Sequence, residues 1–394
     1  MGKILRIPII KLITIFFILI HITLACTTGL VTANATADDR ALLWKNRDTS
    51  HEDNELMYFR HADVHFIAII NVDDTSQVWA GINNFGFAII NAESRDMGFS
   101  EKNTQYDGEG FLMKKALIKC KTIDDFEKML IATNDSRRDV TSNFGIIDAT
   151  GNAAYFETGN RIYFRIDADD QNETKTEFLV RANFAKHGKG DEVYGKIRYE
   201  KAEDFFQQAV KNNCLDYKYI ISKVSPDISL PGSIGKKEVF RKTQDTINRY
   251  SSVSAAVFQG TKKNEPAELA TFWCTLGKPI VSISVPLWVY AEKIPNKLNA
   301  KNGAPLNQIF QEIKTFAYPD TTNNKMLEVE TAIKIHEKMQ WTQNSIFRKT
   351  ERKLKKWRQN PPAAEEVAKF QKEMVECAYK RAEKILKKFK NKQL

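Results

Sequence analysis

Cysteine is scarce in this 394-residue sequence, and its five cysteines do not form a metal-binding pattern. Cys120, Cys214, Cys274 and Cys377 are scattered singly, and no two of the five have the C-x-x-C spacing of common zinc sites. We therefore expect no metal and no cofactor. In an oxidising compartment some of these four could pair as disulfides, and buried free thiols are an equal alternative.

Long apolar runs are also few, because only residues 12–24 form one. Three basic residues precede this run and Ala25 follows it, which is typical of a secretory signal peptide and too short for a convincing membrane span. The sequence has no internal repeat and no low-complexity linker. We predict a signal peptide over residues 1–25 and an exported protein, periplasmic or extracellular.

Cleavage after Ala25 would make Cys26 the first residue of the mature chain. An N-terminal cysteine carries a nucleophilic thiol and an α-amine, which has a pKa near ~8 and can act as a base. A cysteine after an apolar segment is also where bacterial lipoproteins are lipidated. Here Leu24 stands one place nearer the cysteine than is usual in lipoproteins, so both interpretations remain open at this point.

Positive charge is concentrated near the C-terminus. The formal net charge is +10, and the segment 331–394 holds 18 Lys and Arg against 7 Asp and Glu. The rest of the mature chain is slightly acidic, so this basicity says little about a substrate pocket. We expect a basic helical C-terminal extension over residues 329–394, whose candidate partner is a membrane surface, and we expect no nucleic-acid partner. The oligomeric state is left open.

Residue periodicity predicts an α+β chain in which strands, helices, strands and helices follow one another. This order favours a fold with two layers of sheet covered by helices, rather than a parallel βαβ fold. A helical pattern recurs from residue 308 onward, with a break at Pro361-Pro362. The expected strands are 26–33, 41–44, 65–72, 77–82, 87–91, 143–147, 153–157, 162–166, 252–259, 269–276 and 281–286, and the expected internal helices are 108–130 and 195–212.

A strand hairpin that returns from Cys26 would place Lys45-Asn46-Arg47-Asp48 beside it. Asp48 could then hold the α-ammonium group, and Lys45 or Arg47 could lower the pKa of the thiol electrostatically. The alternative for such a polar cluster at a strand end is a solvated turn. His61 and His65 lie four apart in an expected strand, on one face, but without an H-E-x-x-H pattern they make a poor metal site.

Several short motifs, taken in order, resemble N-terminal-nucleophile hydrolases. The chain is similar to the acyl-CoA:6-aminopenicillanic acid acyltransferase family (peptidase family C45), and more remotely to penicillin V acylases and bile salt (choloylglycine) hydrolases. Each motif alone is weak evidence. The resemblance rests on the order of the motifs and on the cysteine at the predicted signal-peptide cleavage site that precedes them. The matching segments are Cys26–Thr28, Leu43–Asp48, Asn83–Asn91, Asn143–Gly151, Phe156–Asn160, Val180–Phe184 and Gly277–Trp288.

The resemblance implies a four-layer αββα sandwich over residues 26–328, with Cys26 as nucleophile and its own amine as base. Asp48 would orient that amine, and Asn183 would donate its side-chain N–H to the oxyanion. A second donor would be a backbone N–H after Gly86, for which Asn91 is the best single choice.

In one position the chain departs from the relatives, which have arginine where it has Lys45. Either Lys45 or Arg47 could therefore supply the positive charge. The later arginine of bile salt hydrolases has only a weak counterpart, Arg249.

Two functions follow from these interpretations. The first is an exported cysteine amidohydrolase or acyltransferase that acts on a small linear, non-peptide amide through an acyl-Cys26 intermediate. The second is a lipid-anchored binding protein without catalysis, in which Cys26 is the lipidated residue. They exclude each other, because lipidation would consume the thiol. A family member that has kept the fold and lost activity is a third alternative.

Overall fold

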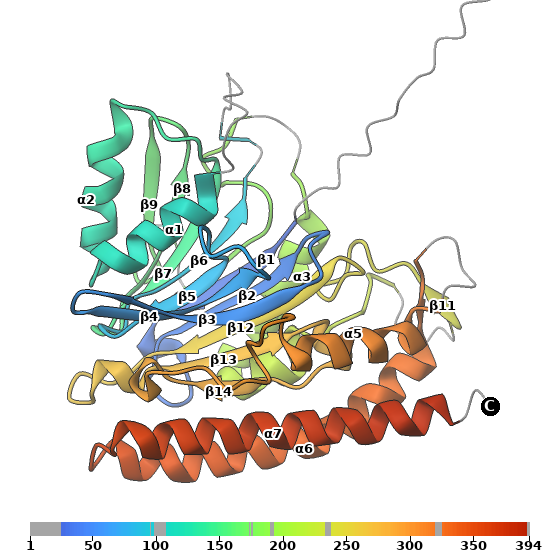
Figure 1. Ribbon diagram of the computed structural model, residues 1–394. Helices are drawn as coiled ribbons and strands as arrows, with labels where there is room; N and C mark the ends of the chain where they lie inside the picture. Colours follow the sequence, from blue (N-terminus) through green and yellow to red (C-terminus); the bar gives the residue numbers. More distant parts are fainter. Residues whose placement is uncertain are drawn as a thin grey trace, which may run out of the picture.

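The computed structural model places two antiparallel β-sheets face to face, with helices on both outer sides (Figure 1). The core lies between the sheets and under the helices. The structure describes residues 25–94, 96–97, 108–172, 174, 176–189, 193–232, 238–319 and 325–391.

The first sheet carries β1, which follows Cys26, at an interior position. Its six strands lie in the order β10-β1-β2-β12-β13-β14, and all neighbours are antiparallel. The strand bounds are β1 Thr27–Val31, β2 Leu42–Asp48, β10 Phe178–Arg181, β12 Ser252–Gln259, β13 Thr271–Leu276 and β14 Val285–Leu287.

The second sheet is a seven-stranded meander in which every strand pairs with the next one along the chain. A two-stranded ribbon, β11 (Phe240–Arg241) with β15 (Leu327–Glu328), lies apart from both sheets. The strands of the meander are β3 Asn54–His61, β4 Val64–Asn71, β5 Ala80–Asn83, β6 Ala88–Glu93, β7 Ser142–Ile147, β8 Ala153–Thr158 and β9 Tyr163–Asp167.

Both faces of the second sheet are apolar, which explains why it needs a layer on each side. In β4, Ile67 and Ile69 belong to the core between the sheets, whereas Phe66, Ala68 and Ile70 belong to the core under α1 and α2. Successive side chains of a strand point to opposite faces, so a continuous apolar run fills two separate cores.

Helices complete the four layers. The pair α1 and α2 covers the second sheet, α3 packs on β1 and β10, and α7 packs on β14, α5 and α6 (Figure 1). The predicted αββα sandwich is therefore confirmed. The helix bounds are α1 Gly108–Lys119, α2 Ile123–Asn134, α3 Lys196–Lys211, α4 Tyr217–Tyr219, α5 Pro305–Ala317, α6 Val329–Trp357 and α7 Ala364–Lys390.

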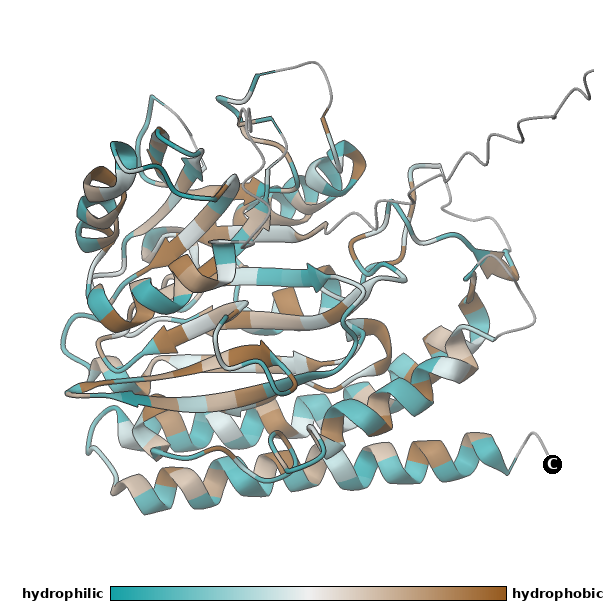
Figure 2. Ribbon diagram, turned by 45° about the horizontal axis from the view of Figure 1, so that its top comes forward, coloured by the Kyte–Doolittle hydropathy of each residue, from teal (hydrophilic) through white to brown (hydrophobic). Residues whose placement is uncertain are grey.

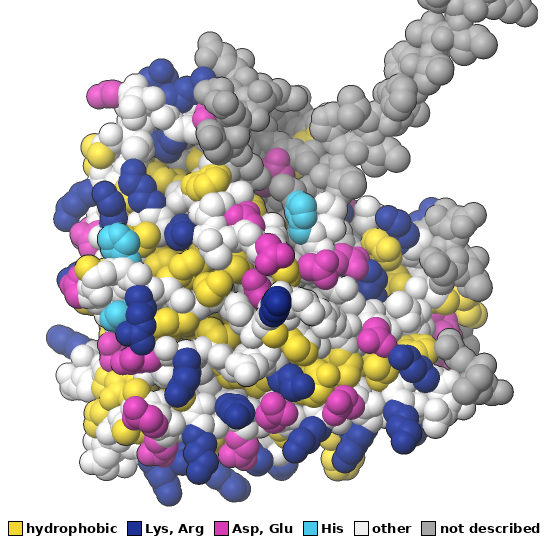
Figure 3. Space-filling model, in the orientation of Figure 1, with side chains coloured by type: hydrophobic (Ala, Val, Ile, Leu, Met, Phe, Trp, Pro, Cys, Tyr) yellow, Lys and Arg dark blue, Asp and Glu magenta, His cyan; other side chains and the backbone are white. Residues whose placement is uncertain are grey.

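The two long C-terminal helices are amphipathic and form the outer layer of the first sheet's side. Their apolar side chains join the main core, and their outer faces are mostly hydrophilic, drawn in teal in Figure 2. Lys and Arg side chains gather along this edge with Asp and Glu among them (Figure 3). Among the described helices, none combines the length and apolarity that a membrane crossing requires.

Two local expectations are wrong. The helix expected over 108–130 is two helices, because Thr122 caps α2 in a capping box with Asp125 and breaks the chain there. His61 and His65 do not share one strand, since β3 ends at His61 and β4 begins at Val64 after a tight turn. All five cysteines are free thiols, so no disulfide forms among them.

Candidate active site

Cys26 lies at the end of the first sheet where β1 begins, and the register of β1 against β2 builds its surroundings. Thr27 lies opposite Asn46 and Thr28 opposite Lys45, so the last residues of β2 come beside Cys26. The backbone N–H of Asp48 hydrogen bonds to the thiol. The polar stretch 45–48 is a buried strand end, and the alternative of a solvated turn is wrong.

The thiol of Cys26 is protonated at neutral pH in this environment. Only 7% of the residue is exposed, and this burial raises the pKa of the thiol. The positive charges of Lys45 and Arg47 oppose the rise, with Lys45 the stronger of the two. A reaction at this thiol would therefore need a base to remove its proton.

Lys45 points into the space between the two sheets, which is an unusual place for a lysine. Its ammonium donates to the carbonyl of Trp79 at 2.9 Å and to Oδ1 of Asn91. Asn91 in turn donates to the carboxylate of Glu109 at the start of α1. Burial lowers the pKa of Lys45 to about 8, so at neutral pH it is mostly protonated and faces the thiol.

Arg47 is held slightly aside from the thiol. Its guanidinium donates to Asn54 and, at 2.9 Å, to Asn71, and it lies over the ring of Trp79 at 4.6 Å from the centroid. Of the two candidates for the positive charge beside Cys26, the geometry therefore favours Lys45.

Asp48 is a buried carboxylate with two strong partners. The hydroxyl of Ser252 donates to it at 2.6 Å, and the guanidinium of Arg249 lies 3.3 Å from its other oxygen. Burial raises the pKa of Asp48, and the nearby Arg249 and Arg198 lower it. Arg249, the weak counterpart of the later arginine of bile salt hydrolases, thus lies at this site. Ser252 lies there too, although no motif in the sequence predicted it.

Asn183 lies just after β10, on the opposite side of Cys26 from Asp48. Its side-chain nitrogen donates to the carbonyl of Glu93 at 2.9 Å, and its oxygen accepts from Arg198 at 2.8 Å. An amide nitrogen has two N–H groups, so one bond to Glu93 leaves a second donor. Because Arg198 can only donate, the amide oxygen of Asn183 must face Arg198, and this fixes the orientation of the amide nitrogen.

Arg198, in the first turn of α3, is like Ser252 a residue of the site that the sequence did not predict. Its guanidinium donates at 2.7 Å to the carbonyl oxygen of Cys26 and to the hydroxyl of Thr27, besides its bond to Asn183. It is 3% exposed, and burial lowers its pKa to about 10. One side chain thus ties Cys26 to Asn183.

The structure therefore brings Cys26, Lys45, Asp48, Asn91 and Asn183 together at one end of the stacked sheets. Among the described residues, no group of His, Cys, Asp and Glu is arranged to hold a metal ion.

No protein-family model matches the chain, and no curated protein is significantly similar to it. Many solved structures resemble it, and three of them serve as examples. The Caenorhabditis elegans ortholog of N-acylethanolamine-hydrolyzing acid amidase is 12% identical, covering 59% of this chain and 92% of its own, with a TM-score of 0.39. The conjugated bile acid hydrolase from Clostridium perfringens is 11% identical, with 68% and 94% covered and a TM-score of 0.43.

The third is a penicillin V acylase from Agrobacterium tumefaciens, 10% identical, with 67% of this chain and 85% of that chain covered and a TM-score of 0.40. Both of the enzyme classes that the sequence resembles more remotely are thus among the similar solved structures. At these identities and TM-scores the matches carry no argument about activity.

Proposed function

We propose that the chain is an amidohydrolase whose nucleophile is Cys26, exposed as the N-terminal residue by cleavage after Ala25. The single observation that carries this proposal is the convergence of the buried thiol with Lys45, Asp48 and Asn183 at the start of β1.

The raised pKa of the thiol explains why the cut would activate the enzyme. Before the cut Cys26 has no free amine, and its thiol stays protonated. After the cut the α-amine accepts the thiol proton, and Asp48, held by Ser252 and Arg249, orients the resulting ammonium. Lys45 stabilises the thiolate by its charge.

The thiolate then attacks the carbonyl carbon of a linear amide and forms a tetrahedral oxyanion. The remaining N–H of Asn183 and the backbone N–H of Asn91 are the proposed donors to this oxyanion. As the C–N bond breaks, the α-ammonium returns its proton to the leaving amine and an acyl thioester remains on Cys26. Water, or a second amine in an acyl transfer, attacks the thioester and regenerates the thiol.

The alternative of a lipid-anchored binding protein fits this packing poorly. Cys26 is almost fully buried, and its carbonyl is bound by Arg198. A diacylglycerol on that sulfur would consume the thiol, and it would leave the groups gathered around the thiol, Lys45, Asp48 and Asn183, without a role.

Cys26→Ser in the exported protein tests the proposal. Serine is a far weaker nucleophile at neutral pH, so we expect cleavage of a panel of acyl amides to fall by several orders of magnitude while the circular dichroism spectrum is unchanged. Cys214→Ser is the matched control, because Cys214 is an exposed free thiol at the end of α3 and should keep full activity. Retained turnover in Cys26→Ser would place the nucleophile elsewhere.

A further inference from the structure

The segment that follows β13 belongs to a motif that the proposed mechanism leaves unused, and it packs against β12. It runs from Gly277 into the short 3₁₀ helix Pro279–Val281. Gly277 has a φ of 95°, in the left-handed region that glycine adopts without strain, and a Cβ there would come within 2.8 Å of Oγ of Ser282. The chain can therefore turn sharply here and place Lys278 inside the protein, where it is 3% exposed.

Hydrogen bonds tie this segment to the turn that leads into β12. The side-chain nitrogen of Lys278 donates to the carbonyl of Ser252 at 3.0 Å and also to the carbonyl of Tyr250. The backbone N–H of Gly277 donates to the carbonyl of Val253 at 2.8 Å. One lysine thus holds two carbonyls of the same turn, and the backbone beside it is fixed to the first residues of the strand.

The same turn carries both side chains that hold Asp48. The guanidinium of Arg249 lies 3.3 Å from one carboxylate oxygen, and the hydroxyl of Ser252 donates to the other at 2.6 Å. The hydroxyl of Ser252 also accepts from the backbone N–H of Arg249 at 2.9 Å. A shift of the turn would therefore move both partners of the carboxylate together.

Lys278 is able to hold its carbonyls on both sides of neutral pH. The rings of Tyr250 and Tyr318 face its side-chain nitrogen, with their centroids at 5.0 Å and 5.4 Å. Burial, and then the positive charge of Lys314, lower the pKa of Lys278 to about 7. A neutral amine still has two N–H groups, so both carbonyls keep a donor when the side chain loses its charge.

We propose that Lys278 is a positioning residue of the candidate active site. Its side-chain nitrogen clamps the turn that carries Arg249 and Ser252. The clamped turn keeps Asp48 in the orientation that holds the α-ammonium of Cys26. This inference rests on the proposed function, because Asp48 has that task only if Cys26 is the free N-terminal residue.

Lys278→Met in the exported protein, assayed with a chromogenic acyl amide, tests the inference. Methionine leaves the carbonyls of Tyr250 and Ser252 without this donor. We expect kcat to fall by about tenfold to a hundredfold, with little change in KM. Burial raises the pKa of Asp48, and looser contacts with Arg249 and Ser252 would oppose that rise less. The carboxylate would then lose its charge at a higher pH, so the acid limb of the pH–rate profile should move to higher pH.

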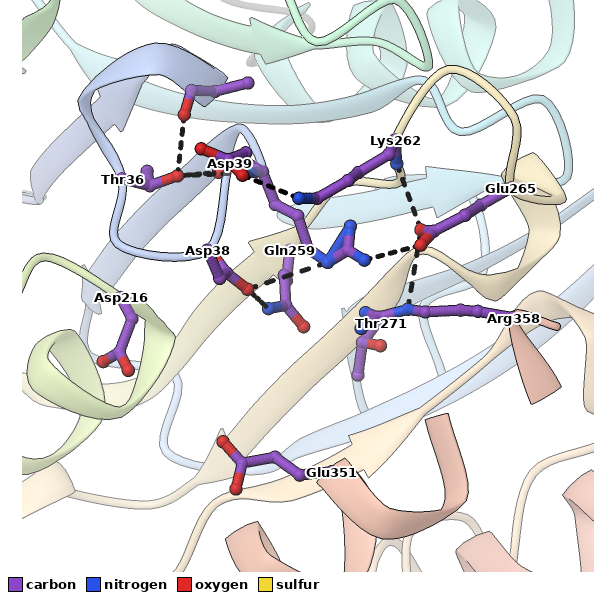
Figure 4. A network of polar contacts seen from close by, with 12 residues as sticks. Thr36, Asp38, Asp39, Asp216, Gln259, Lys262, Glu265, Thr271, Glu351 and Arg358 are labelled. Atoms are coloured by element: carbon purple, nitrogen blue, oxygen red, sulfur yellow. Dashed lines mark hydrogen bonds and ion pairs between the residues drawn. The ribbon is translucent and has the colours of Figure 1, made fainter. Parts of the chain in front are cut away.

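A double-mutant cycle with Ser252→Ala shows whether the effect passes through the turn. Lys278→Met should cost less in kcat when Ser252 is already alanine, because both changes disturb the same contact of Asp48. Arg40→Met is the matched control. Arg40 is a buried cation, 5% exposed, and it donates at 2.6 Å to Glu265 in the polar network beyond the other end of β12 (Figure 4). Arg40→Met should lose stability in urea unfolding and keep both its kcat and its acid limb.

Lys278→Gln is the second variant, for use if the methionine variant does not fold. It keeps N–H donors on a shorter side chain, so its kcat and acid limb should lie between those of the wild type and of Lys278→Met. If the folded variant at Lys278 behaves like Arg40→Met, or if its effect and that of Ser252→Ala simply multiply, Lys278 is only structural and the inference is wrong. Cys26→Ser, assayed beside these variants, separates the two proposals: an inactive Cys26→Ser confines such a failure to Lys278, whereas retained turnover overturns both.

Discussion

Replacement of Arg198 by methionine tests whether this residue connects the nucleophile to the oxyanion donor. Methionine fills much of the same buried volume but donates no hydrogen bond. The change leaves three buried acceptors without their donor, namely the carbonyl of Cys26, the hydroxyl of Thr27 and the amide oxygen of Asn183. It also leaves the Asn183 amide held only by its bond to the carbonyl of Glu93.

The structure gives the size of both effects. At about 1 kcal/mol for each orphaned acceptor, the free energy of unfolding should fall by about 3 kcal/mol. Loss of a correctly placed oxyanion donor typically lowers kcat by about 10²–10³-fold, and a misplaced Asn183 should approach that loss. We expect KM to change much less, because the contact acts on the transition state.

Arg138 provides a matched control within the same chain. It is 6% exposed against 3% for Arg198, its pKa is also lowered to about 10, and its guanidinium donates to the carbonyls of Gly159, Leu130 and Ile162 rather than to a residue of the candidate site. Arg138→Met should lose comparable stability in urea unfolding and keep its kcat on a chromogenic acyl amide. If Arg198→Met behaves like Arg138→Met, with lower stability and normal kcat, then Arg198 is only structural.

Two further predictions concern the charge and the donor at the site. Asn183→Ala should remain folded with kcat lower by about 10²–10³-fold, and Asn183→Asp should be no faster, because it places an acceptor where a donor is required; near-normal rates in both would make Asn183 a turn residue. The rate of the wild-type enzyme should fall as pH rises through the Lys45 pKa of about 8, because deprotonation removes the charge that stabilises the thiolate. In Lys45→Arg the side chain stays charged, so a pH–rate profile should lose this alkaline limb, and an unchanged limb would assign it to another group.

Local patterns in the sequence carry much of the fold. The strand expected over 252–259 is β12 with the same bounds, because its run of small and apolar residues is buried on both faces between turn residues. The helix expected over 195–212 is α3 within one residue at each end. The break between α1 and α2 was missed, although Thr122 and Asp125 have the spacing of a capping box.

The residues of the candidate site also fall into those that local sequence predicts and those that only tertiary packing brings in. Cys26, Lys45 and Asp48 were predictable together because one hairpin joins them, and the hairpin register follows from short-range pattern. Arg198 contacts Cys26 across a separation of 172 residues in the sequence, and Ser252 contacts Asp48 across 204. Helix α3 has several charged residues, and only the packing of that helix decides which one is buried against Cys26.

The central claim is that Cys26 is the free N-terminal nucleophile of the mature chain, and intact-mass spectrometry of the exported protein tests it most directly. We predict the mass of residues 26–394 without modification, and, after rapid acid quenching of a reaction with an amide substrate, an added mass equal to one acyl group on Cys26. A diacylglycerol on Cys26, or a mature chain that begins at another residue, would contradict the account.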